Sequence, residues 1–179
     1  VASSEGVARL APGAARWTVL PLTDIALTGC REDYVTPEIM SVAIGPTSIA
    51  AAVLDGLLVV DDDASSLTTA TVLGPAAGVD CTIYAIEVES DGAWLLGTDT
   101  GLVRVTRDLS RIGRIRPVEG LPSSQVTALH RRGDEIWMGF PGDGAAVHRF
   151  EPPETAIARE PPPLITDVSS PLAFEVAAL

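Results

Sequence analysis

The stretch that decides the fold is residues 91–105, DGAWLLGTDTGLVRV, together with a second copy of its outline at residues 134–150, DEIWMGFPGDGAAVHRF. Each copy reads as a turn, a Trp-bearing strand, a glycine-rich turn and a further strand with Arg near its end. The glycines that mark the second turn, Gly101 and Gly144, stand 43 residues apart. The sequence therefore predicts two diverged copies of one β-hairpin repeat.

The same outline extends toward the N-terminus. Residues 49–60, IAAAVLDGLLVV, place Gly56 45 residues before Gly101, and Gly6 lies 50 residues before Gly56. The longer first interval is explained if residues 23–37 are an insertion loop. A period of 40 to 50 residues with four short strands per unit is typical of β-propeller blades. We therefore expect an all-β fold, a β-propeller of about four blades of four antiparallel strands, as a single domain over residues 1–179.

The blades are expected at approximately 38–73, 81–117 and 124–160, with a fourth formed by residues 1–20 together with 164–179. Pairing of the two termini would close the ring and remove exposed sheet edges, so Gly6–Leu20 should share a sheet with Leu164–Leu179. The alternative is that the chain is part of a larger propeller. The strands expected are Gly6–Leu10, Arg16–Leu20, Met40–Gly45, Ser48–Leu54, Gly56–Asp61, Leu67–Leu73, Thr82–Glu89, Ala93–Thr98, Gly101–Thr106, Ile112–Pro117, Gln125–Arg131, Glu135–Phe140, Ala145–Phe150, Thr155–Arg159, Leu164–Ser169 and Leu172–Leu179.

A family resemblance rests on residues 120–129, GLPSSQVTAL, on residues 136–139, IWMG, and on residues 101–104, GLVR. These segments resemble the bacterial two-component-regulator type of β-propeller repeat over about residues 81–150. The resemblance implies a periplasmic sensing propeller or an envelope-associated interaction domain. The motif of that family is structural, so the resemblance transfers no catalytic residues.

Composition restricts the partners. The net charge is −12 and all 12 basic residues are Arg, with no Lys and no Asn anywhere in the chain. A chain this acidic argues against nucleic acid or an anionic membrane surface as partner, and favours cations or proteins. The apolar run Ile49–Val60 is interrupted by Asp55 and is too short to span a bilayer, so we expect no direct membrane insertion.

Carboxylates precede the marker glycines at equivalent turns. In a propeller such turns lie on one face around the axis, so a ring of carboxylates could hold a cation such as Ca²⁺, which takes oxygen ligands. Asp-Gly is also suited to tight hairpin turns for purely conformational reasons, and this is the simpler explanation. The residues concerned are Glu5, Asp55, Asp99 and Asp143. No other cofactor is expected.

The two cysteines, Cys30 and Cys81, both lie just before an expected first strand, in polar connectors on the same face of adjacent blades. A disulfide between them would tie the insertion to the next blade and would indicate an oxidising compartment. Within the insertion, Arg31, Asp33 and Tyr34 form a candidate binding group, because exposed loops on rigid scaffolds often carry recognition. Ordinary loop decoration is the alternative.

The tryptophans of the two clear copies, Trp94 and Trp137, are interpreted as one repeat position that fills space between neighbouring blades. The two histidines, His130 and His148, have no second His or Cys at metal-ligand spacing and no neighbouring nucleophile. We therefore predict no catalytic residues.

The function expected is that of a non-enzymatic propeller, periplasmic or extracellular, that serves as a protein-interaction or assembly module in a bacterial envelope or secreted complex. A periplasmic domain that senses a small molecule or saccharide is the first alternative. A propeller hydrolase or lyase is the second. With aromatics at only 4% of the chain, a sugar-stacking pocket has few candidate residues.

Overall fold

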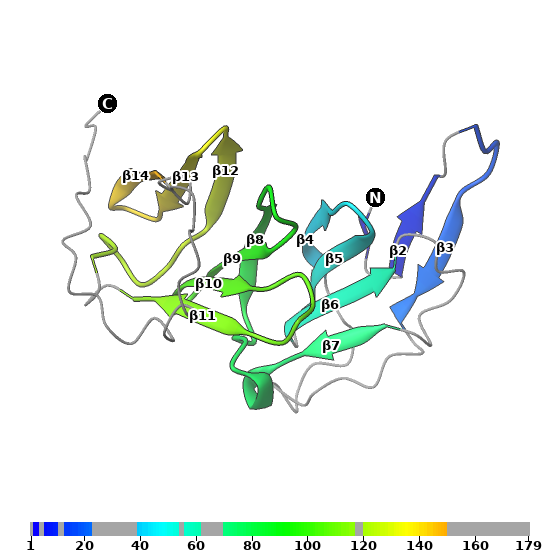
Figure 1. The fold of residues 1–179 in the computed structure, drawn as a ribbon, viewed down its shortest axis with the longest axis horizontal. Helices are drawn as coiled ribbons and strands as arrows, with labels where there is room; N and C mark the ends of the chain where they lie inside the picture. The colour runs from blue at the N-terminus through cyan, green and yellow to red at the C-terminus, as the bar shows by residue number, and fades with distance from the viewer. Residues whose placement is uncertain are drawn as a thin grey trace, which may run out of the picture.

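The computed structural model describes residues 2–3, 6–10, 13–22, 39–53, 56–61, 70–116 and 120–149. Over these residues the chain is all-β, as predicted, and its strands form four antiparallel sheets. A short 3₁₀ helix, η3 (Pro75–Ala77), was not expected from the sequence; it ends at Gly78, which has a φ of +87°. The sheets follow one another along the chain (Figure 1).

Each sheet is a meander of consecutive strands. The first sheet contains β1 (Ala2–Ser3), β2 (Gly6–Arg9) and β3 (Thr18–Pro21). The second contains β4 (Ile39–Ile44), β5 (Ser48–Val53), β6 (Gly56–Asp61) and β7 (Thr71–Leu73). The third contains β8 (Ile83–Val88), β9 (Trp94–Thr98), β10 (Gly101–Val105) and β11 (Ile112–Ile115). The fourth contains β12 (Ala128–Arg132), β13 (Glu135–Phe140) and β14 (Gly144–Arg149).

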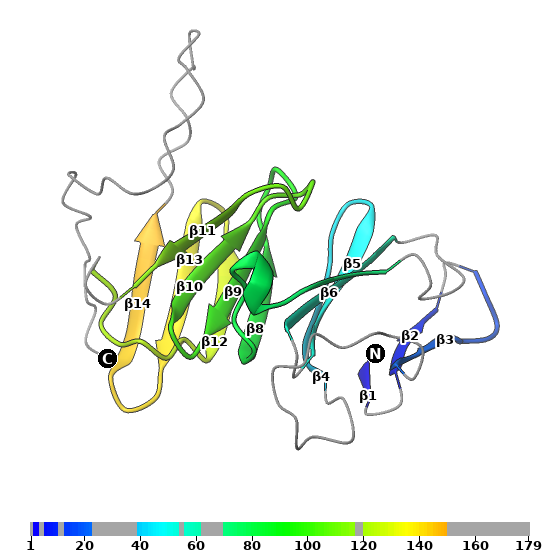
Figure 2. The ribbon, with the colours of Figure 1, turned by 90° about the horizontal axis from the view of Figure 1, so that it is seen from below.

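The four sheets stack face to face in a row, and three apolar clusters fill the spaces between successive sheets (Figures 1 and 2). Side chains alternate between the two faces of a strand. On β5, Ala50 and Ala52 therefore pack toward the third sheet, while Ile49, Ala51 and Val53 pack toward the first. Because both faces are covered, β5 is apolar at nearly every position, as strands buried on two sides require.

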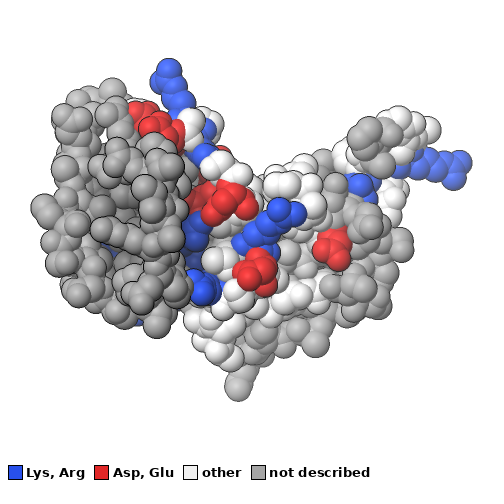
Figure 3. All heavy atoms as spheres, viewed as in Figure 1, with Lys and Arg blue, Asp and Glu red and all other residues white. Residues whose placement is uncertain are grey.

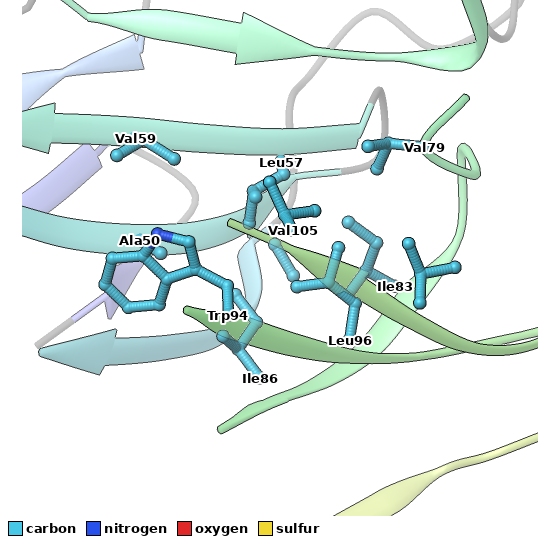
Figure 4. Packing of buried hydrophobic residues seen from close by; sticks show 11 residues of the cluster. Ala50, Leu57, Val59, Val79, Ile83, Ile86, Trp94, Leu96 and Val105 are labelled. Carbon is cyan, nitrogen blue, oxygen red and sulfur yellow. The ribbon is translucent and has the colours of Figure 1, made fainter. Parts of the chain in front are cut away.

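The third sheet repeats this division. Trp94 and Leu96 of β9 pack toward the second sheet, whereas Leu95 packs toward the fourth. The Trp94 side chain is fully buried, and Figure 4 shows its indole ring beside Ala50. A single large ring thus fills the space that the small alanines of β5 leave open.

Two of the marker glycines, Gly56 and Gly101, are equivalent in three dimensions, whereas Gly144 has a φ of +84° and open space around it. Gly56 and Gly101 have φ values of +130° and +133°, and each is the first residue of a third strand, β6 and β10. A Cβ at either position would overlap a backbone carbonyl oxygen of the fourth strand, that of Leu73 or Ile115. Backbone conformation and close approach of the next strand both require glycine there.

Within the described residues the row is open: the first and fourth sheets lie at its opposite ends (Figure 1). Ala2–Ser3, which was not predicted as a strand, pairs with Gly6 and Val7 of β2. It therefore takes part of the edge at which Leu172–Leu179 was expected to pair. The insertion 23–37 and the strands expected at 155–159 and 164–179 lie outside the described residues, so closure of the ring stays a prediction.

The interpretation of Trp94 and Trp137 as one repeat position is wrong. Strand pairing aligns Thr98 with Phe140, because each faces the marker glycine of its own hairpin. Counting three residues back from each gives Leu95 and Trp137. The two tryptophans are thus offset by one residue, which places them on opposite faces of their sheets.

Candidate interaction faces at the two ends of the row

Exposed large apolar side chains gather at the ends of the row. Leu10, Trp17 and Val19 of the first sheet's hairpin are 45%, 53% and 55% exposed, and Trp137 of the fourth sheet is 36% exposed. Met40 and Ile44 on β4 are the other large apolar residues exposed among the described residues. In a stack of sheets, the outermost faces are the surfaces with no neighbour to cover them.

The end face of the first sheet is built by one hairpin. Val7 is buried against the second sheet, so its neighbour Ala8 points the other way, and Ala8 pairs with Val19. The last rung, Arg9 with Thr18, is followed by Leu10 and Trp17, which alternation places on the same side as Ala8 and Val19. We call Leu10, Trp17 and Val19 the first end face.

The end face of the fourth sheet has an aromatic residue among small ones. Trp137 stands between His130 of β12 and Val147 of β14 in one row across the sheet. In the next row, Gly139 stands between Ala128 and Ala145. The opposite face of the same sheet packs Ile136, Met138, Phe140 and Ala146 against the third sheet. We call Trp137, Gly139, Ala145 and Val147 the second end face.

Ionic contacts in the third sheet hold loops and strands together. Asp80, in the loop before β8, accepts hydrogen bonds from the hydroxyls of Thr98 and Thr100, each at 2.7 Å, and from Nη1 of Arg114 at 2.6 Å. Burial raises the pKa of the Asp80 carboxyl. The hydrogen bonds from Thr100, Thr98 and Arg114, with the Arg114 charge, outweigh that effect and lower the pKa below 3.8.

A second ionic group joins the turn before β9 to β10. Arg104 pairs with Glu89 and, through Nη2 at 2.6 Å, with Asp91, whose other oxygen caps the N–H of Ala93. Burial raises the pKa of Glu89 above its usual value, and the Arg104 charge only partly opposes this. Cationic and anionic side chains lie side by side on the face seen in Figure 3. These groups neutralise one another, as structural ion pairs do.

The histidines stand apart from each other. Burial lowers the pKa of His148, which lies on β14 and pairs with Ile136. His130 lies on β12 and pairs with Trp137, so its side chain is on the other face of the fourth sheet. Across the part of the chain that the structure describes, no three His, Cys, Asp or Glu side chains come together to hold a metal ion.

The residues proposed for calcium are only partly placed. Asp99 and Asp143 lie exposed in the turns before their marker glycines, as expected for hairpin turns. Glu5 and Asp55 lie outside the described residues, so the ring of four carboxylates stays untested. Arg31, Asp33 and Tyr34 also lie outside them, as does Cys30. No free cysteine is found in the described part of the chain, where Cys81 is half-buried; its pairing with Cys30 stays a prediction.

The structure adds two groups of residues that the sequence did not single out, the first and second end faces. Trp17 was noted only as part of an outer strand, and Trp137 was assigned to a space between blades. The signal in the sequence is the alternation, which places Leu10 and Trp17 on the strand face that points away from the second sheet. Without knowledge of which sheets are terminal, that signal cannot be separated from ordinary burial.

A hollow of about 540 Å³ lies in the turn between β10 and β11, lined by Thr106, Arg107, Asp108, Ser110 and Arg111. Its carboxylate, Asp108, is bonded to Thr106 and Ser110, and these bonds lower its pKa to about 2. Arg107 reaches across to the hydroxyl of Thr47 in the second sheet. The hollow therefore offers polar contacts without an aromatic side chain.

No protein-family model matches the chain, and no curated protein matches it. Within the described residues, no helix is long and apolar enough to cross a membrane. Among solved structures, the chain is similar to PorZ, an essential bacterial surface component of the type-IX secretion system of Porphyromonas gingivalis, with a TM-score of 0.48 and 23% sequence identity. The match covers 60% of this chain and 17% of the PorZ chain, so the chain spans under a fifth of the length of that protein.

Proposed function

We propose that this chain forms a β-propeller, or part of a larger one, that acts as a non-enzymatic protein-interaction or assembly module of a bacterial envelope or secreted complex. The observation that carries the proposal is the first end face, where Leu10, Trp17 and Val19 stand exposed together at the end of a row of tightly packed sheets. Exposed apolar side chains that gather on one face of an ordered sheet are typical of surfaces that bind another protein.

The arrangement of the strands supports the propeller part of the proposal. The first strands of successive sheets lie near one another, β4 beside β8 and β8 beside β12, while β7 and β11 lie on the other side of the row (Figure 1). In a propeller, the first strand of each blade faces the axis and the fourth lies at the rim. Side chains also join the sheets, as Gln125 does in donating to the Tyr84 hydroxyl at 2.7 Å.

The first end face has the composition of a binding surface. Trp is enriched among the residues that contribute most to protein–protein binding, and apolar burial contributes roughly 25 cal/mol per Å². Trp17 lies with Leu10 on one side and Val19 on the other, so one partner surface could cover all three side chains. The chain's acidity would favour a partner with complementary basic residues around an apolar centre.

The sensing alternative has less support. The hollow beside β11 contains no aromatic ring on which a saccharide could stack. The ionic groups around Asp80 and Arg104 are already satisfied by their own partners and connect strands of one sheet. A periplasmic or extracellular location rests on the resemblance of residues 101–104 and 120–129 to an envelope-associated repeat, and belongs to the proposal.

The test is site-specific photo-crosslinking in the chain's own bacterium, where its natural protein partners are present. A photoreactive phenylalanine analogue is introduced at position 17 and, as control, at position 71 on β7, which is also exposed. We expect position 17 to yield one discrete cross-linked protein that is absent at position 71 and lost with Val19→Asp. Identical products from both positions, or none from position 17 in a correctly folded chain, would overturn the proposal. Protease accessibility in fractionated cells tests the location separately.

A further inference from the structure

The interface between the third and fourth sheets shows how a sheet's far face is covered. A Cβ on Gly97 would lie 2.6 Å from the carbonyl oxygen of Val126, so the connector leading into the fourth sheet crosses β9 at its glycine. The Val126 N–H donates to the carbonyl oxygen of Thr98 at 2.9 Å. Two apolar side chains of that connector, Leu121 and Val126, are buried in the same cluster as Leu95.

The interface between the second and third sheets follows the same plan. Val79, in the connector, and Ile83, the first residue of β8, are fully buried in the same cluster as Ala52 and Leu57 of the second sheet. The covering pair is thus Val79 with Ile83 in one case and Leu121 with Val126 in the other. Corresponding members of the two pairs are 42 and 43 residues apart, which is the spacing of the repeat.

The second end face is the equivalent of a covered face. Gly139 and Phe140 of the fourth sheet correspond to Gly97 and Thr98, and Trp137 corresponds to the buried Leu95. Among the described residues, a Cβ on Gly139 would meet only Ala128, at 3.1 Å for its Cβ. The face therefore keeps the glycine that admits a crossing backbone, although the described residues supply no such backbone.

The chain's own sequence supplies the next covering pair. Leu164 lies 43 residues after Leu121, and Val168 lies 42 residues after Val126. The two are four residues apart, the same separation as Val79 and Ile83. We propose that the segment Leu164–Val168 docks on the second end face, with its apolar side chains against Trp137 and Val147 and its backbone crossing Gly139.

This inference goes beyond the proposed function and is independent of it. The inference concerns the second end face, whereas the proposed function rests on the first end face. The occupant is identified by the repeat spacing. The crossing point has a small residue in all three sheets, Ala52, Gly97 or Gly139.

The test measures the accessibility of Trp137 in the full chain. Trp17→Phe removes the most exposed tryptophan, and the remaining Trp94 is fully buried, so acrylamide quenching then reports on Trp137. In this background we expect weak quenching, and we expect Leu164→Asp with Val168→Asp to raise the quenching constant about threefold or more. The matched control places the same two charges at Ser169 and Ser170, which should leave quenching nearly unchanged.

Three outcomes would overturn the inference. Trp137 in the Trp17→Phe background could already be quenched as strongly as a free indole. The Leu164 and Val168 changes could have no more effect than the control. Protection could also vanish on dilution while light scattering shows dimers separating, which would assign the face to a second copy. Circular dichroism verifies that each variant is folded, and hydrogen exchange of the peptide containing residue 168 gives a second readout. None of these results depends on cross-linking at residue 17, so the two proposals fail separately.

Discussion

Trp94 of the third sheet lies over Gly45 of the second so closely that a Cβ on Gly45 would stand 2.7 Å from Cη2 of the indole. The φ of Gly45 is not in the positive range, so space alone requires glycine there. This pair is one of the places where the sequence of one sheet depends directly on the residue chosen in its neighbour. It separates packing from backbone strain, which makes it a useful site for measurement.

Gly45→Ala should destabilise the fold by about 1–3 kcal/mol, because the rigid indole cannot yield to an added methyl group in a packed interface. Denaturant unfolding gives the free energy. In a Trp94→Phe background the smaller ring extends less far toward Gly45. Gly45→Ala should therefore cost at least 1 kcal/mol less there. Equal costs in both backgrounds would show that the contact is not the cause. The exposed Thr71→Ala is the control, with a change within about 0.5 kcal/mol.

Substitutions of Trp94 should separate the effect of side-chain volume on stability from the effect of the buried indole N–H. Its indole N–H is buried and has no hydrogen-bond partner among the described residues, and burial of such a donor costs free energy. Trp94→Ala, which leaves a cavity, should cost about 3–5 kcal/mol. Trp94→Phe retains most of the ring and removes the donor, so it should cost less than half as much. Thermal and chemical denaturation both report the order, and a Phe variant as unstable as the Ala variant would contradict it.

The marker glycine Gly101 combines a positive φ with the approach of the Ile115 carbonyl, whereas Gly142 has a φ of +80° and no heavy atom within 4 Å of its added Cβ. Gly142→Ala should therefore cost about 1 kcal/mol, the cost of backbone strain alone. Gly101→Ala should cost at least 2 kcal/mol more, because β11 must move away. The comparison is made by urea unfolding. Similar costs at the two sites would show that β11 adapts freely.

The acid stability of the chain should depend on Asp80. Its folded-state pKa lies below the ordinary value of 3.8, so the unfolded chain binds the proton more readily. The stabilisation from this carboxylate is therefore present above about pH 4 and is lost as the pH falls through the folded-state pKa. Asp80→Asn should lower stability at neutral pH and flatten the loss of stability below pH 4.

The exposed Asp134→Asn, in the turn between β12 and β13, is the matched control for charge. Free energies of unfolding measured between pH 2.5 and 7 should run parallel for this control and the parent chain. A parallel curve for Asp80→Asn as well would exclude Asp80 as the source of the pH dependence.

The predicted disulfide between Cys30 and Cys81 can be measured by mass. A non-reduced sample treated with an alkylating agent should gain no mass, and should gain two adducts after reduction. A disulfide closing a loop of this length stabilises by about 2–4 kcal/mol, so Cys81→Ser should lower the melting temperature by several degrees. Two alkyl adducts before reduction would show two free thiols and contradict the predicted disulfide.

The sequence predicted the strands best where the repeat is clearest. Gly56–Asp61 and Glu135–Phe140 were predicted with the observed bounds, and the strands of the third sheet agree within two residues at either end. Alternating apolar residues between glycine-rich turns leave little choice of register there. The strand expected at 67–73 forms only at Thr71–Leu73 within the described residues, and Ala2–Ser3 was missed because two residues carry no periodicity.

The candidate sites were less predictable for a physical reason. Trp94 and Trp137 look equivalent in sequence, yet one residue of offset relative to the marker glycine sends one ring into an interface and the other to the end of the row. Only the hydrogen-bonded register reveals that offset. Likewise, the exposure of Trp17 depends on its sheet being first in the row, which is a property of the whole arrangement and not of local sequence.

The division of each strand's side chains between two apolar clusters has a consequence for how the sequence can evolve. Among the described residues each sheet shares an apolar cluster only with the sheet before it and the sheet after it, so stability is carried as a series of nearest-neighbour terms. Duplication or deletion of one whole repeat then leaves every remaining interface chemically the same, provided that the glycine, the small residues and the covering pair move together. Such a row tolerates changes of length in evolution that would disrupt a fold with one shared centre.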